Sequence, residues 1–260
     1  MLPTRRIVLA LVLCAVLSPA AHAQINLAWN NCITQATAAE NMNYACDGSR
    51  TGFPFKLVAS FKAPANLAEF VGIQMVIDVQ QSLTHPGPDP LPDWWRLRDG
   101  ECREGNLAFP TSMTGIGTGG APSALCFNPW TGTTTGGGYD YASDYFVSGM
   151  GRLITGFART TPTTLTAGQH YLSGVITLDN AFDVPNEADP KQCIGCCYPM
   201  YIILEQVQLF QINGQPPPQQ DTYVLNSPDV RNWVTWQASG TCQQTPAKRT
   251  SWGRIKTTYR

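Results

Sequence analysis

The sequence predicts an all-β protein, a β-sandwich stapled by disulfide bonds. Three observations support this prediction: apolar residues alternate with polar ones along several segments, the 260 residues include 23 glycines and 20 prolines, and nine residues are cysteine. Alternation places one face of a strand on a core, and abundant glycine and proline imply many turns. Charged residues make up only 13 % of the chain and the net charge is −1, which excludes a coiled coil and gives no general attraction to nucleic acid.

The predicted strands follow one another at short intervals along the chain. The apolar phase shifts near Glu205, which indicates a β-bulge or a strand buried on both faces. No segment carries a sustained helical stripe, although 32–46 and 63–70 could each hold a short helical turn. An immunoglobulin-like or jelly-roll-like sandwich with little helix is the expected architecture. The strands are expected within 25–29, 53–61, 71–79, 139–147, 153–159, 172–178, 201–212 and 233–236.

The first 23 residues have the pattern of a secretory signal peptide. Arg5 and Arg6 precede an apolar run over 7–17, and Ala21-His22-Ala23 forms a small-x-small cleavage site. The apolar run is too short to cross a membrane, and no later segment approaches the required length. We therefore expect a secreted protein, extracellular or periplasmic, with three parts: the signal peptide 1–23, a sandwich domain 24–240 and a C-terminal tail 241–260.

Eight cysteines remain after removal of the signal peptide, and an even number in an exported chain indicates a disulfide framework. The sequence cannot choose among the possible pairings. Pairing of neighbours would join Cys32 to Cys46 and Cys102 to Cys126, with Cys242 returning to the cluster near residue 195. Metal binding by that cluster is a weaker alternative, because zinc needs four ligands and export is oxidising. The eight residues are Cys32, Cys46, Cys102, Cys126, Cys193, Cys196, Cys197 and Cys242.

Signatures of catalysis are absent from the sequence. Only His85 and His170 remain after export, and there is no nucleophile elbow, phosphate-binding loop or dinucleotide fingerprint. This favours a non-catalytic binding or structural protein. The alternative is a secreted glycoside hydrolase that uses a carboxylate pair. Its candidate acids are Asp78, Asp140, Asp144 and Glu205, of which Asp78 and Glu205 lie within strand patterns and are expected to point into water.

Tryptophan is abundant, and exposed aromatic rings on a sandwich can stack on sugars. Trp94 and Trp95 follow a proline-rich segment, and Trp130 lies in a long loop. If the segment is extended, one ring of the Trp94-Trp95 pair points outward. The competing interpretation places these rings in the core. The sequence therefore offers Trp94, Trp95 and Trp130 as candidate carbohydrate-binding residues, with an extracellular polysaccharide as the expected partner.

Two long loops, 111–138 and 179–199, are expected to interrupt the sandwich, and loops of this kind often carry binding sites. The second begins with clustered carboxylates, which could bind calcium together with loop carbonyls. The spacing does not match an EF-hand, so a solvated acidic loop is the simpler interpretation. No other cofactor is expected. The calcium candidates are Asp179, Asp183, Glu187 and Asp189.

The C-terminal tail contains five basic residues and no acidic residue. Its aromatic and aliphatic residues recur at a helical spacing, so a short helix would place them on one face. The tail could attach the protein to a cell-envelope component, or it could simply pack on the sandwich with its charges in water. The candidate attachment residues are Lys248, Arg249, Trp252, Arg254, Lys256, Tyr259 and Arg260.

Four short motifs together resemble a family of uncharacterised secreted bacterial proteins. The motifs are INLAWNNC at 25–32, PDWW at 92–95, RNWVTWQ at 231–237 and the ending SWGRIKTTYR, which is similar to a TWGxxKxxYR pattern. The resemblance implies a β-sandwich of this length, and it carries over no catalytic residue. The segment around 165–180 also resembles strands of cohesin and carbohydrate-binding sandwiches at the level of fold.

Overall fold

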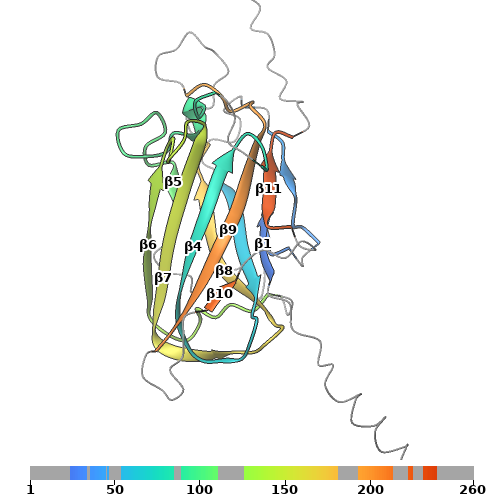
Figure 1. Cartoon of the computed structure of the whole chain (residues 1–260), viewed down its shortest axis with the longest axis vertical. Coiled ribbons are helices and arrows are strands. Elements are labelled where there is room, and N and C mark those ends of the chain that lie inside the picture. The colour runs from blue at the N-terminus through green and yellow to red at the C-terminus, as the bar shows by residue number, and fades with distance from the viewer. Residues whose placement is uncertain are drawn as a thin grey trace, which may run out of the picture.

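The computed structural model contains two β-sheets that face each other (Figure 1). The structure describes residues 24–33, 36–44, 46, 54–84, 89–110, 126–180, 193–212, 222–224 and 231–238. Within these residues it confirms the predicted all-β class: the chain is built from strands, with one short 3₁₀ turn, η1 (Asp93–Trp95). The sandwich architecture is therefore the frame on which every candidate site lies.

The smaller sheet has four strands in the order β1-β3-β8-β5, all antiparallel. Its central strands β3 and β8 are almost wholly buried. The strands are β1 (Gln24–Trp29), β3 (Phe55–Lys62), β8 (His170–Leu178) and β5 (Leu107–Ala108).

The larger sheet has seven strands in the order β2-β11-β9-β4-β7-β6, with β10 beside β9. Its long central strands β4 and β9 give the molecule its length (Figure 1). The strands are β2 (Asn41–Met42), β11 (Trp233–Trp236), β9 (Met200–Gln211), β4 (Leu67–Gln80), β7 (Met150–Leu165), β6 (Thr135–Ala142) and β10 (Thr222–Val224).

The core lies between the sheets and follows the predicted alternation. In β4, Ile73, Met75 and Ile77 point inward and are buried, and their intervening neighbours line the outer face. An apolar side chain on every second residue thus produces one buried face, as the two-residue strand period requires. Burial of this face supplies the main driving force for pairing the sheets.

The predicted phase shift near Glu205 is a bulge. Gln206 lies opposite Val76, whereas Leu204 lies opposite Ile77, so Glu205 has no partner on β4. The extra residue lets both halves of β9 bury their apolar side chains against the same core.

Three local expectations were wrong. Residues 67–70 begin β4 rather than a helical turn. Among the described residues of 32–46 the structure has a β-bridge and the short strand β2, again without a helical turn. Residues 135–138, expected in a loop because of their glycines, form the first half of β6. Pairing with β7 decides the conformation there, since glycine has no side chain that could show a period.

The neighbour-to-neighbour disulfide pairing was also wrong. The bonds join Cys32 to Cys126, Cys46 to Cys196 and Cys102 to Cys193, across 94, 150 and 91 residues. Strand crossovers bring loops that are distant in sequence to the same end of the sandwich, so sequence proximity does not decide the pairing.

Cys197 is disulfide-bonded as well, so none of the three clustered cysteines keeps a free thiolate for a metal. The expected return of Cys242 to this cluster lies outside the described residues, as do the signal peptide 1–23 and the tail 241–260. Among the residues described, no helix is long and apolar enough to cross a membrane.

Candidate binding cleft

A cleft of about 630 Å³ lies between strand β6 and the loop that follows η1. Its size falls in the range of small-ligand sites. One wall is the 97–105 loop and the other is the edge of the larger sheet. The lining residues are Leu97, Arg98, Asp99, Gly100, Glu101, Gly105, Tyr139, Asp140 and Tyr141.

Two tyrosines of β6 fasten the sheet to the loop segment. The Tyr139 hydroxyl donates to the carbonyl of Leu107 at 2.6 Å, and the Tyr141 hydroxyl donates to the carbonyl of Trp95 at 2.7 Å. Burial raises the pKa of Tyr141 well above its usual range, so its hydroxyl stays a donor. Tyr139 remains 43 % exposed and lines the cleft.

Polar contacts within the loop hold its shape. Glu101 accepts from the backbone amide of Arg98 at 3.0 Å and from the Ser143 hydroxyl at 2.6 Å. Glu104 accepts from the amide of Gly100, whose φ of +84° is readily adopted only by glycine. The loop is thus ordered by its own side chains before any ligand binds.

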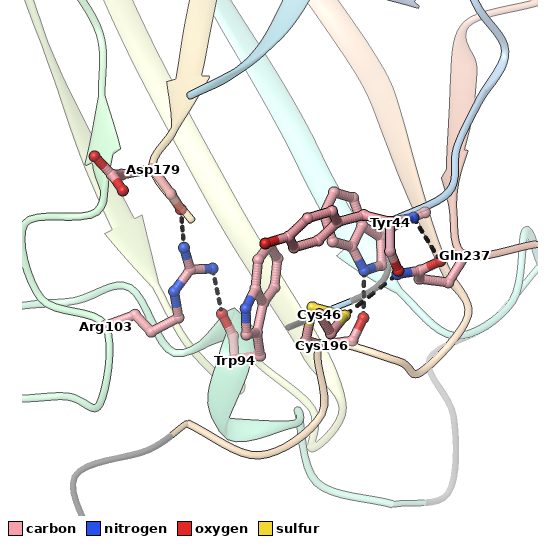
Figure 2. Close-up of a disulfide and its surroundings, with 8 residues drawn as sticks. Tyr44, Cys46, Trp94, Arg103, Asp179, Cys196 and Gln237 are labelled. Carbon is pink, nitrogen blue, oxygen red and sulfur yellow. Dashed lines mark hydrogen bonds between the residues drawn. A yellow bond between two sulfur atoms is a disulfide. The ribbon is translucent and has the colours of Figure 1, made fainter. Parts of the chain in front are cut away.

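A buried arginine, Arg103, anchors the 97–105 loop to the core. Arg103 donates to the carbonyls of Trp94 and Asp179, and its guanidinium lies 3.7 Å from the centre of the Trp94 ring (Figure 2). The Cys102–Cys193 disulfide fixes the neighbouring residue to the segment before β9. Sequence reasoning missed Arg103, because an arginine in a turn-rich segment normally lies at the surface.

The residues that line the cleft are mostly polar. Asp99, Glu101 and Asp140 are acidic, Arg98 is basic and Tyr139 is aromatic. Hydroxyl groups can donate to carboxylates and accept from a guanidinium, and the apolar face of a sugar can pack on a tyrosine ring. The arrangement therefore suits a polyhydroxylated ligand. Asp140 is the only one of the four predicted catalytic acids that lines this cleft.

The tryptophan residues predicted to bind carbohydrate are not available for stacking on a sugar. Trp94, Trp95 and Trp130 are each at most 1 % exposed. Trp94 stacks on Trp236 at 4.6 Å between ring centres, and Trp95 meets the same ring edge-on at 5.8 Å. The expectation of one outward ring assumed an extended segment, whereas η1 turns both rings inward.

Trp130 serves the other end of the core. Its indole N–H donates to the Leu172 carbonyl, and its ring meets Phe157 edge-on. Trp94, Trp95 and Trp130 therefore belong to the core of the sandwich that carries the cleft.

Asp78 and Glu205 come together on the outer face of the larger sheet. Arg152 donates to both oxygens of Asp78, at 2.6 and 2.5 Å. Asp78 is only 4 % exposed, so the expectation that it points into water was wrong. Burial, and then the charge of Asp78, raise the pKa of Glu205. The charges of Asp78 and Glu205 therefore affect each other, but both oxygens of Asp78 already accept from Arg152.

Asp144 has a structural role in the loop after β6. It accepts from the amides of Leu91 and Gly149 and from the guanidinium of Arg96 at 2.5 Å. Burial acts to raise the pKa of Asp144, and these hydrogen bonds outweigh it and lower that pKa. The Asp144 side chain therefore ties three segments together.

The predicted calcium loop is described only at its first residue. Asp179 follows β8, its amide donates to the Asn106 carbonyl at 2.8 Å and its own carbonyl accepts from Arg103. Asp183, Glu187 and Asp189 lie outside the described residues. Within the described ranges no three His, Cys, Asp or Glu side chains are placed to hold a metal ion.

No protein-family model, curated protein or solved structure matches this chain. The resemblance to secreted bacterial proteins therefore stays a prediction, and the function has to be argued from the cleft.

Proposed function

We propose that the protein is a secreted, non-catalytic binding protein that recognises carbohydrate in the cleft between the 97–105 loop and β6. The observation that carries this proposal is the lining of the cleft, which combines acidic residues, an arginine and the partly exposed Tyr139. A few polar groups placed by a rigid scaffold are typical of small-ligand sites. Disulfide bonds are consistent with a protein that works outside the cell.

The proposal is tested by binding of the full chain to a panel of polysaccharides, with and without calcium. We expect binding to at least one polysaccharide, with a loss of tenfold or more in the Asp99→Asn/Asp140→Asn variant. The Glu69→Gln variant, whose substitution lies in β4 away from the cleft, serves as the control and should bind like the original protein. Binding that the cleft variant leaves intact, or no binding across the panel, contradicts the proposal. A requirement for calcium would point to the loop after Asp179.

The alternative function, glycoside hydrolysis, has one observation in its favour. Burial and the neighbouring Asp78 raise the pKa of Glu205. A carboxyl group with a raised pKa next to a second carboxyl group is the pattern of a general acid and its partner in glycosidases. The bidentate contact of Arg152 with a buried Asp78 argues against it, because the second carboxylate must be free to meet the substrate. Hydrolysis that is abolished by Glu205→Gln would establish this alternative.

A further inference from the structure

Strand β6 is an edge of the larger sheet that is open over residues 135–138, and from Tyr139 onward it forms one wall of the cleft. It pairs with β7 on one side only, and it forms the left border of the sheet in Figure 1. Residues 136–140 are exposed. A sheet edge of this kind presents backbone donors and acceptors to whatever strand can reach them.

The register identifies which backbone groups face outward. The amide of Thr160 donates to the carbonyl of Thr134 at 3.0 Å, and Thr135 lies opposite Arg159. Hydrogen-bonded pairs alternate along an antiparallel ladder, so residues 136, 138 and 140 bond to β7 while 135, 137 and 139 direct their N–H and C=O groups away from it. None of these outward groups has a hydrogen-bond partner among the described residues.

The edge also lacks the features that normally block pairing. Residues 135–142 contain no lysine, arginine or proline, and Asp140 is their one charged residue. A Cβ atom added at Gly136 or at Gly138 would meet nothing within 4 Å, so the outer face of the strand is uncovered there, whereas Phe157 covers the opposite face at Gly137.

We infer that this edge pairs with the same edge of a second copy of the chain. An antiparallel pair with its twofold axis at Gly137 sets Gly137 opposite its own copy and Thr135 opposite Tyr139. Every outward donor and acceptor of the three residues then finds a partner, and the two larger sheets become one continuous sheet. The same register sets Gly136 opposite Gly138 and keeps the two Asp140 carboxylates at opposite ends of the seam, where their repulsion is small. Self-complementarity of this kind is what a twofold dimer requires.

The test uses light scattering after size exclusion, over a concentration series of the full chain. We expect a mass of two chains at the upper concentrations. The Gly136→Lys/Gly138→Lys variant sets lysine opposite lysine and should have the mass of one chain. The Gly136→Glu/Gly138→Lys variant sets glutamate opposite lysine across the axis and should regain the dimer. Gly156→Lys, on the same outer face but in β7, is the matched control and should leave the dimer unchanged.

Amide hydrogen exchange gives an independent measurement. Gly137 and Tyr139 should exchange more slowly in the dimer than in the double-lysine variant, with the inward amide of Asp140 equally protected in both. A single-chain mass at every concentration, with fast exchange at Gly137, would overturn the inference, since the edge would then be free for a strand of another protein. A dimer that survives the double-lysine substitution would overturn it too.

Discussion

Arg103 is a fully buried cation whose contacts determine how the cleft loop is held. It donates to two carbonyls and lies on the Trp94 ring (Figure 2). Hydrogen bonds to a charged group contribute about 1.5–3 kcal/mol each. We expect Arg103→Met to lower the free energy of unfolding by about 2–4 kcal/mol in urea. It should also weaken polysaccharide binding, because the loop loses its anchor.

The control for this substitution is Arg98→Met. Arg98 lines the cleft but is exposed, so its loss should change the free energy of unfolding by less than about 0.5 kcal/mol. Equal stability of the Arg103 variant and the original protein would show that the carbonyl and ring contacts do not hold the loop.

The lowered pKa of His170 leads us to expect a loss of stability in acid. Burial, and then the charge of Lys62, lower its pKa from the ordinary 6.5 to about 4, and its Nε2 lies 3.0 Å from the Asn26 amide nitrogen. Between these two pKa values the unfolded chain binds a proton that the folded chain does not. The free energy of unfolding should therefore fall as the pH drops from about 6.5 to 4, by at most about 3 kcal/mol.

The measurement is urea unfolding across this pH range, compared between the original protein and His170→Gln. The variant should lose this part of the pH dependence because glutamine does not titrate. An identical fall in both proteins would assign the acid sensitivity to other groups.

At the scale of elements, prediction succeeded where side chains alternate and failed where they do not. The phase shift at Glu205 revealed the bulge in β9 because apolar residues flank it on both sides. Residues 136–138 have no side chains, so their place in β6 is visible only through the pairing with β7. The expectation for Trp94 and Trp95 failed because the 3₁₀ turn depends on tertiary packing against Trp236.

Two disulfides provide a matched comparison at this scale. Cys102–Cys193 and Cys32–Cys126 span 91 and 94 residues. Because the two loops are of similar length, each bond should restrict the unfolded chain to a similar extent and stabilise the fold by about 2–4 kcal/mol. Only the first holds the cleft loop. We expect Cys102→Ser/Cys193→Ser to lose both stability and polysaccharide binding. Cys32→Ser/Cys126→Ser should lose stability alone, as measured by thermal unfolding and by titration of the folded protein. Equal binding by the two variants would contradict a role for the bond in the cleft.

For the whole molecule, the fold class was readable from the sequence, whereas the connections between distant segments were not. A local sequence pattern does not indicate which loops meet at one end of a sandwich. The disulfide pairs and the cleft were therefore visible only in the structure. The acids and tyrosines of the cleft come from two segments about 40 residues apart, and only Asp140 was a sequence candidate.

The cysteine count leads to one prediction for the whole chain. Six cysteines pair with one another, Cys197 is bonded, and Cys242 is the only other cysteine after residue 23. Peptide mapping without reduction, on the chain from residue 24 onward, should therefore recover a Cys197–Cys242 bond. A free thiol at Cys242 would contradict this pairing.

The most direct test of the central claim measures retention and cleavage of the same polysaccharides together. The protein is run through gels that contain each polysaccharide, and the same mixtures are assayed for new reducing ends. Our account predicts that at least one polysaccharide retards the protein, that Asp99→Asn/Asp140→Asn abolishes the retardation, and that no reducing ends form. Release of reducing ends by the original protein, lost in Glu205→Gln, would contradict it and make the protein a hydrolase.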